Sequence, residues 1–454
     1  MRKQRTAFGK IVSFFILIIT IYILLQIYGI YKTKNLNDFI RAEQNIYTSS
    51  FSRDFEVKLG KEGSYKIEST TFNDAMFCRE MNVNPNTAYK VSCKVKTDNV
   101  ITKQQNHGGG AQISINGTVE KSSSVIGTQD WTELILYFNS GDRTKVNIGF
   151  RLGGYDDECT GTAWFDDIKL EVGELDTTNE WEFVCFIFKN LQVQLDENNY
   201  DITMSVEDIN QMKDGMTRFK NSFEEFSKGK IKVNYKIIEI DEPITSLSYD
   251  TENAYYVSPE NVNEIITPYL NKQEYDHIFI AVKLGDLSKN IEIPVNDWIG
   301  LGGISYQNIG FSNIRLPSSQ KSYMYKYIVG VNEFPEEVFV HEFLHTLERN
   351  SKELGYERPE LHDYEKFGYK NEKVIGLKKW YIDYMNHNIK DSSGQTYGLD
   401  EAVYTIKPVH ESNFEYSMEI DLENEPKNII EEIRGLFNNI FNLVEHIIGN
   451  VLIK

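Results

Sequence analysis

The stretch "EEVFVHEFLHTLERN", residues 336–350, decides how the second half of this chain is interpreted. His341 and His345 are four residues apart, so both imidazoles lie on one side of a helix. Zinc is the metal that such a pair suits best, and Glu342 is close enough to serve as the general base. Behind these side chains runs an apolar stripe of Val340, Leu344 and Leu347. The stretch therefore predicts a helix that packs on one side and holds zinc on the other.

The predicted zinc site indicates that the protein is a hydrolytic enzyme. The metal lowers the pKa of a bound water from near 16 toward about 7, which makes hydroxide available at neutral pH. Glu342 would accept that proton and pass it to the leaving amine, while zinc polarises the carbonyl. The alternative is an ordinary helix with two coincidental histidines. Only 8 histidines occur in the whole chain, which favours the zinc site.

The segment "VHEFLHTL" resembles the zinc metallopeptidases of the zincin class. In their metzincin branch the helix ends at a glycine and a third histidine follows soon after. Here Gly355 comes late and the next histidine is His362, so the chain departs from that pattern by an insertion. The resemblance implies His362 as the third ligand. Two alternatives stay open, because Asp363 has the position used in some short zinc proteases and Glu365 has thermolysin-like spacing.

Two further stretches are similar to metzincin features. "GLGGISYQNIGF", residues 300–311, stands where that family has the edge strand on which peptides lie by β-augmentation, although a glycine-rich hairpin is the alternative. Met385 is a candidate for the methionine turn under the zinc, and plain core is its alternative. Oxyanion stabilisation has three candidates: Tyr364, Tyr369 and Tyr384.

The first 34 residues predict a membrane anchor. A basic segment precedes residues 11–30, which carry no charge and have about the length that a helix needs to cross a bilayer. The basic flank predicts a cytoplasmic N-terminus and places the bulk of the chain outside the cell membrane. A cleaved signal peptide is the alternative, but no Ala-x-Ala-like site follows the apolar run. Polar residues 35–50 are expected to form a stalk.

Residues 51–173 show alternating polar and apolar side chains in short runs, separated by Gly, Asn, Asp and Ser. This pattern is typical of an all-β sandwich or jelly roll. The predicted strands include "AYKVSCKVKT", "GAQISINGTV", "WTELILYFNS", "KVNIGFRLGG" and "AWFDDIKLEV".

The successive segments "NVNPNTAYKVSCKVKT", "GTQDWTELILYF" and "GTAWFDDIKLE" resemble strands of the carbohydrate-binding jelly-roll modules appended to xylanases and other polysaccharide hydrolases. That resemblance implies a glycan ligand. It also implies a structural Ca²⁺ at Asp166 or Asp167, since calcium prefers oxygen ligands. A solvated strand end is the alternative for the two aspartates. Trp131 and Trp164 are the conspicuous aromatic residues, although a tryptophan in a sandwich is often part of the core.

After residues 174–179 the pattern changes to a buried apolar strand, a long amphipathic helix over residues 205–229 and two more strands. These elements predict an α/β (α+β) zincin-like domain over residues 180–425. Residues 426–454 have helical apolar spacing and predict an amphipathic helix. This helix is expected to dock on the catalytic domain, with a membrane or oligomer contact as the alternative.

Four cysteines occur, with no Cys-x-x-Cys spacing, so a cysteine zinc site is not expected. One disulfide among the first three is an open possibility, and buried free thiols are the other. The four are Cys78, Cys93, Cys159 and Cys185.

The 454-residue chain is thus expected to be multidomain, and its net charge of −19 argues against a nucleic-acid partner. The predicted function is a membrane-anchored extracellular zinc endopeptidase that acts on peptide, glycoprotein or cell-wall substrates. Two alternatives stay open. One is a surface carbohydrate-binding or adhesion protein with an inactive zincin domain, and the other is a zinc hydrolase of non-peptide bonds.

Overall fold

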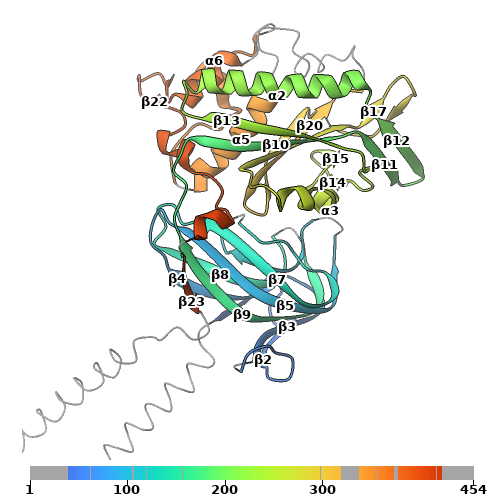
Figure 1. Ribbon diagram of the computed structural model, residues 1–454, viewed down its shortest axis with the longest axis vertical. Helices are drawn as coiled ribbons and strands as arrows, with labels where there is room; N and C mark the ends of the chain where they lie inside the picture. The colour runs from blue at the N-terminus through green and yellow to red at the C-terminus, as the bar shows by residue number, and fades with distance from the viewer. Residues whose placement is uncertain are drawn as a thin grey trace, which may run out of the picture.

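The computed structural model describes residues 39–61, 63–104, 107–118, 120–155, 157–296, 298–318, 337–353, 355–372, 377–415 and 417–421. The predicted anchor of residues 1–34 and the predicted helix of residues 426–454 lie outside this set. Within it, no helix has the length and apolar character needed to span a membrane. The described chain forms a β-sandwich below and an α/β domain above (Figure 1).

The sandwich consists of two sheets whose inner faces form one core. One sheet has the order β1-β4-β8-β6, and the other has β2-β3-β9-β5-β7. Side chains alternate between the core and the outer faces, as the sequence pattern predicts. The strands are β1 (Ile40–Glu43), β2 (Ser49–Asp54), β3 (Ser64–Asn73), β4 (Ala75–Asn82), β5 (Ala88–Thr102), β6 (Gly110–Ile115), β7 (Gly127–Asn139), β8 (Lys145–Gly153) and β9 (Cys159–Gly173).

The sandwich begins earlier than the sequence suggests. The prediction of a stalk over residues 35–50 is wrong from Phe39 onward, because β1 pairs with β4 and β2 begins at Ser49. Phe39 itself is buried, with its ring 4.6 Å from that of Tyr65. β1 is short, and its residues are exposed or half-buried, so its sequence carries little alternation for a pattern to detect.

The α/β domain is built on a five-stranded sheet of order β13-β10-β16-β20-β19. Four strands run parallel, and β19 lies antiparallel at the edge beside β20. β10 is buried on both faces, which explains its continuous apolar run. The strands are β10 (Glu180–Phe188), β13 (Lys232–Ile240), β16 (His277–Lys283), β19 (Gly300–Tyr306) and β20 (Ile309–Leu316).

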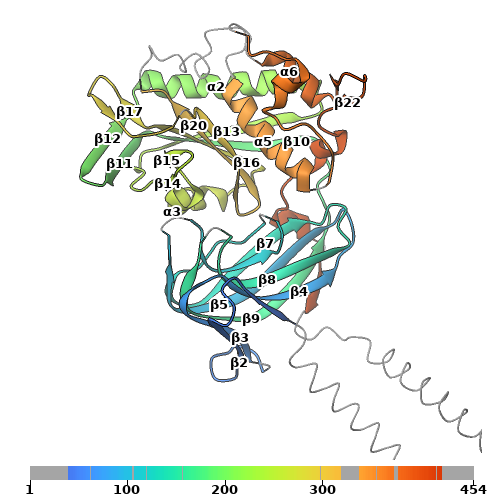
Figure 2. The same ribbon diagram turned by 180° about the vertical axis from the view of Figure 1, so that it is seen from behind.

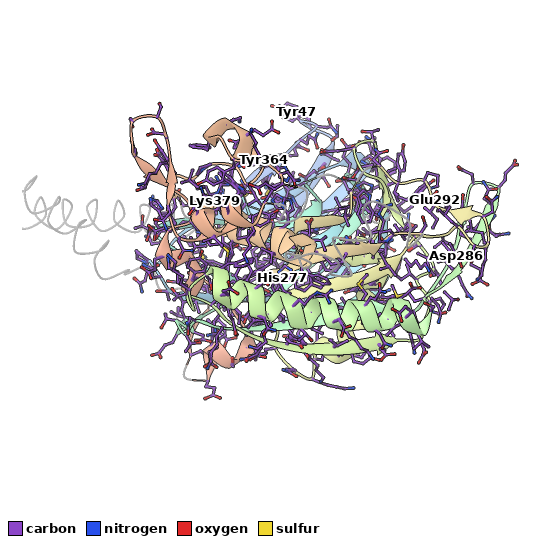
Figure 3. All side chains as sticks on the ribbon, turned by 90° about the horizontal axis from the view of Figure 1, so that it is seen from above. Tyr47, His277, Asp286, Glu292, Tyr364 and Lys379 are labelled. Atoms are coloured by element: carbon purple, nitrogen blue, oxygen red, sulfur yellow. The ribbon has the colours of Figure 1, made fainter. Side chains whose placement is uncertain are left out.

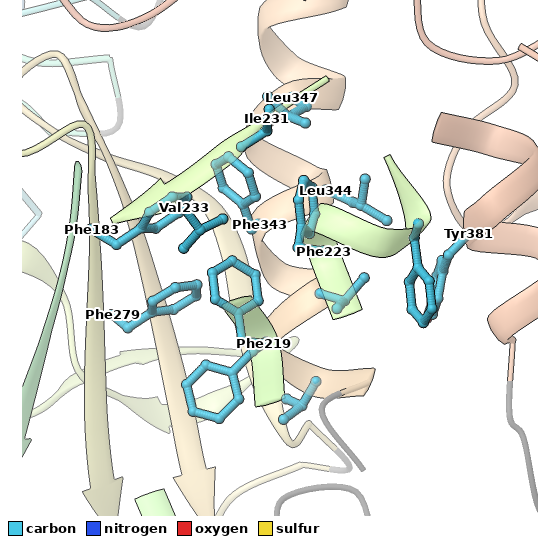
Figure 4. Packing of buried hydrophobic residues seen from close by; sticks show 14 of the residues in the cluster. Phe183, Phe219, Phe223, Ile231, Val233, Phe279, Phe343, Leu344, Leu347 and Tyr381 are labelled. Carbon is cyan, nitrogen blue, oxygen red and sulfur yellow. The ribbon is translucent and has the colours of Figure 1, made fainter. Parts of the chain in front are cut away.

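Helices cover both faces of this sheet. α2 (Val206–Phe226) and α5 (Glu337–Glu353) pack on one face, and α3 (Pro259–Leu270) packs on the other. Ser205 caps α2 and forms the predicted capping box with Asp208. Phenylalanine rings from α2, α5 and the sheet interlock in the core between the helices and the sheet (Figure 4).

The smaller elements lie around this sheet, with α6 beside α5 (Figure 2). They are β11 (Asn190–Leu195), β12 (Asn198–Thr203), β14 (Ser248–Asp250), β15 (Ala254–Tyr256), β17 (Gly285–Asp286), β18 (Ile291–Glu292), the 3₁₀ helix η2 (Asp363–Phe367), α6 (Lys378–Met385), β21 (Ile389–Lys390), β22 (Thr396–Tyr397), and the 3₁₀ helices η3 (Glu401–Thr405) and η4 (Glu411–Phe414).

The chain returns to the sandwich at its C-terminal end. Strand β23 (Met418–Asp421) pairs with the end of β9, so residues predicted to belong to the catalytic domain complete a sandwich sheet. Just before it, the Glu411 carboxylate binds Lys90 and Tyr137 of the sandwich, 3.0 and 2.5 Å away. Residues 406–421 therefore connect the two domains a second time.

Candidate metal centre

Three histidines converge on one side of helix α5. The Nε2 atom of His341 lies 2.9 Å from Nε2 of His362 and 3.1 Å from Nε2 of His345. Two of the side chains come from successive turns of α5, and the third comes from the loop that leads into η2. Among the residues that the structure describes, these three form the group of His, Cys, Asp or Glu side chains with metal-ligand spacing.

The triad fits a zinc ion. A tetrahedral site with Zn–N distances of 2.0–2.1 Å places its nitrogens about 3.3 Å apart. The two Nε2–Nε2 separations of 2.9 and 3.1 Å need only small side-chain movements to reach that value. Three neutral imidazoles with a fourth, open position are the arrangement of a catalytic zinc site, not a closed structural one.

Two of the three rings have a partner at the other nitrogen. His341 Nδ1 is 2.9 Å from the hydroxyl of Tyr381 on α6, and His345 Nδ1 is 2.9 Å from Oε2 of Glu348. A ring that donates its Nδ1 proton to such a partner leaves Nε2 free for a metal. Neither partner is expected from the sequence, although Glu348 lies three residues after His345, a spacing that brings helical side chains together.

Burial favours the neutral imidazoles that metal binding requires. Loss of solvation holds the pKa of His341 well below its usual value, and it also lowers the pKa of His362. For His345 burial acts in the same direction, but the hydrogen bond to Glu348 and the charge of Glu342 outweigh it and raise the pKa.

Glu342 lies between the triad and strand β19. Its side chain is buried, and burial raises the pKa of its carboxyl to about 7, a value suited to a general base. The backbone N–H of Gly302 donates a hydrogen bond to it. A Cβ atom at Gly300 or Gly302 would come within 2.4 Å of Glu342 atoms, so glycine is what lets β19 approach.

These residues line a cleft of about 780 Å³. Its walls are α5, the glycines of β19, the His362 loop and α6, with Trp298 and Tyr364 also lining it. The predicted packing stripe of Val340, Leu344 and Leu347 is fully buried on the other side of α5. The helix thus presents its two histidines to the cleft and its apolar side chains to the core, the arrangement that the spacing in the sequence predicts.

The structure does not bring the two alternative third ligands to the triad. The Asp363 carboxylate is paired with Lys366 at 2.5 Å, and Glu365 is exposed on η2. Met385 is buried in the core at the end of α6, and α6 contacts the histidines through Tyr381 instead. Of the three tyrosine candidates, Tyr369 donates to Asp383 and Tyr384 donates to the carbonyl of Pro359, whereas Tyr364 lines the cleft.

The predicted calcium ligands have other partners. Asp166 is buried and accepts hydrogen bonds from the backbone N–H groups of Leu59, Gly60 and Asp167. Asp167 is exposed, 3.9 Å from the ammonium of Lys169. Asp166 therefore holds the β2–β3 loop against the sandwich, and a Ca²⁺ ion at this pair stays a prediction.

The sandwich tryptophans offer little surface to a sugar. Trp164 is 9% exposed, and its indole N–H donates to Asp54, while Trp131 is half-buried. All four cysteines are buried free thiols, so the disulfide among the first three is not formed.

No family model matches the chain. A curated relative, the tRNA(Glu)-specific nuclease WapA of Bacillus subtilis subsp. natto (strain BEST195), is 30% identical over 98 residues. This match covers 21% of the present chain and 4% of that protein.

Solved structures similar to part of this chain include carbohydrate-binding modules. A family 4 module is 16% identical over 30% of this chain and 89% of its own, with a TM-score of 0.22. TmCBM61, solved with β-1,4-galactotriose, is 13% identical over 31% and 92%, also at 0.22. The xylanase 10B modules of Clostridium thermocellum, solved with xylohexaose, are 11% identical over 53% and 43%, with a TM-score of 0.22.

Proposed function

We propose that this protein is a zinc-dependent endopeptidase, anchored in the cell membrane by its N-terminal apolar segment. The observation that carries the proposal is the convergence of His341, His345 and His362 beside Glu342 in one cleft. Zinc would be held by the three Nε2 atoms, and it would supply a Lewis acid that polarises the scissile carbonyl.

The chain's own residues supply the other parts of the reaction. Glu342 lines the same cleft as the three histidines, and its carboxylate would take a proton from water and return it to the leaving amine. Strand β19 lies at the edge of the sheet, since β20 is its only neighbour among the described strands. At its middle, the Gly302 N–H donates to Glu342 and the Gly303 carbonyl accepts from Arg349, which leaves the backbone groups on either side for a peptide. An extended peptide can pair with such an edge and place its carbonyl over the triad. This edge favours a peptide over a non-peptide substrate.

The second candidate is a surface carbohydrate-binding protein in which the zinc site is not hydrolytic. In this case the ligand would be a polysaccharide, as in the carbohydrate-binding modules solved with oligosaccharides. Exposed aromatic rings of the sandwich would contact the sugar. The exposed aromatic side chains of this domain are Tyr47, Phe55, Phe72 and Tyr155. A peptidase with such a domain would act on glycoprotein or cell-wall substrates.

One experiment separates the candidates. The full chain in detergent is assayed for zinc content and for casein cleavage, beside Glu342→Gln and His362→Ala. We expect one zinc and cleavage in the unaltered chain, retained zinc with about 10²- to 10⁴-fold slower cleavage in Glu342→Gln, and loss of both in His362→Ala. Cleavage that survives Glu342→Gln would contradict the proposal. Zinc binding without cleavage, together with retention on a polysaccharide gel, would establish the second candidate.

A further inference from the structure

Glu348 connects two of the three candidate ligands, although it touches only one of them. It lies on α5 and is 8% exposed. Its Oε2 atom is 2.9 Å from Nδ1 of His345, and its Oε1 atom accepts the backbone N–H of Leu361 at 2.6 Å. Leu361 directly precedes His362 in the chain. One carboxylate therefore contacts the helix ligand and the backbone that carries the loop ligand.

Both backbone polar groups of Leu361, the residue before His362, have side-chain partners. The Leu361 carbonyl accepts the indole N–H of Trp380 at 2.8 Å, and the Leu361 side chain is buried. Arg358 adds a second connection, because its Nε donates to the carbonyl of Glu348 at 3.1 Å. Between the end of α5 and η2 the described residues form no helix or strand, so no backbone ladder holds this loop. Side-chain contacts such as these must then set the position of His362.

We infer that Glu348 is a positioning residue for the metal centre. Its Oε2 atom holds the His345 ring in the tautomer whose Nε2 faces the metal, and its Oε1 atom ties the His362 loop to α5. The inference rests on the proposed zinc site. It goes beyond that proposal, because it assigns to one side chain the geometry between a helix ligand and a ligand 17 residues away (362 − 345).

The two contacts require a carboxylate of this length. Both neighbouring groups are N–H donors when His345 binds zinc through Nε2, so both oxygens must accept. In Glu348→Gln the carboxamide has one oxygen and one NH₂, so it can satisfy only one of the two donors. In Glu348→Asp the charge stays, but the side chain is one methylene shorter and cannot reach both.

The test measures metal affinity instead of catalysis. Zn²⁺ affinity is determined by competition with a chelator for the full chain and for Glu348→Gln, Glu348→Asp and Glu360→Gln. The absorption spectrum of the Co²⁺-substituted proteins is recorded as well, and circular dichroism of the metal-free proteins verifies folding. Glu360→Gln is the matched control. Both Glu348 and Glu360 pair with Arg358, at 3.8 and 3.4 Å, but Glu360 forms no hydrogen bond with the three histidines in the described part of the chain.

We expect Glu348→Gln and Glu348→Asp to bind Zn²⁺ about 10- to 100-fold more weakly and to show an altered Co²⁺ spectrum. Glu360→Gln should stay within about 2-fold, because it leaves both N–H groups with their acceptor. Unchanged affinity and spectrum in either Glu348 variant would overturn the inference while the zinc site stands. If the unaltered chain binds no zinc, both the proposed function and the inference fall. Zinc binding without peptide cleavage would overturn the proposed function alone.

Discussion

Gly302 lets strand β19 approach Glu342 because glycine has no side chain. The sequence marks residues 300–311 as a glycine-rich strand but gives no reason for the glycines. In the structure a Cβ at position 302 would lie 2.4 Å from the Glu342 carbonyl oxygen and 2.8 Å from Oε2 of the same residue. Glycine therefore lets the edge strand lie against Glu342, the proposed general base, and donate its N–H to the carboxylate.

Gly302→Ala should separate catalysis from metal binding. The methyl group forces β19 and Glu342 apart, at a cost of about 1–3 kcal/mol, and each 1.4 kcal/mol in the barrier is tenfold in rate. We expect kcat/KM for casein to fall about 5- to 150-fold with one zinc retained. Gly60→Ala is the control, since its Cβ would meet Asp166 at an ordinary 3.5 Å. Equal activity of the two variants would contradict this role of Gly302.

At the scale of elements, helix α5 packs on the sheet through a mostly apolar interface, in which His277 of β16 is a buried polar residue. His277 on β16 is fully buried, and its ring nitrogens lie 3.1 Å from the hydroxyl of Ser312 and 3.4 Å from that of Thr346 on α5. Phe183, Phe279 and Phe343 surround its ring. In the view from above, His277 lies near the middle of the picture (Figure 3). Burial, with a smaller effect of the Arg349 charge, holds its pKa well below 6.5.

This histidine should make stability depend on pH. Its pKa is lowered in the folded state, so below pH 6.5 the unfolded chain takes up a proton that the folded chain refuses. Its contribution to stability is complete above that pH and is lost as the pH falls. Between pH 7 and pH 5 the unaltered chain should lose about 2 kcal/mol more than His277→Gln, which keeps polar partners for both hydroxyls but does not titrate. Urea unfolding of both proteins in chelator measures this difference, and parallel pH profiles would refute it.

At the scale of the whole molecule, two connections join the domains. Besides residues 174–179, the chain crosses the boundary again over residues 406–421 and ends in strand β23 of the sandwich. Lys407, in the second connection, binds residues of the first connection and of the strand that follows it. Its buried ammonium contacts the carboxylate of Asp176, the hydroxyl of Thr178 at 3.1 Å and the carbonyl of Glu180 at 2.8 Å.

Lys407→Met should therefore weaken the α/β domain at its first strand. Methionine keeps the apolar stem but loses the charged hydrogen bonds, which are worth about 1–2 kcal/mol here because Asp176 is half-exposed and becomes hydrated. We expect the midpoint of urea unfolding to be lower. Tryptophan fluorescence measures this unfolding, because Trp181 lies on β10. Lys390→Met, at an exposed position, should shift the midpoint little. Identical midpoints for the two variants would show that Lys407 does not hold the crossing.

The sequence by itself determined what depends on neighbours a few residues apart. Alternation located strands β5 to β9, the capping box at Ser205 began α2, and four-residue spacing placed His341 and His345 on one face of α5 with an apolar stripe behind. Only the tertiary structure decided what depends on distant segments. In the structure His362, and not Asp363 or Glu365, lies beside the other two histidines. Tyr381 and Glu348 bond to the histidine rings, and β23 pairs with β9 of the sandwich. The reason is physical, because local periodicity is imposed by backbone geometry, whereas a loop's position depends on the side chains that bind it.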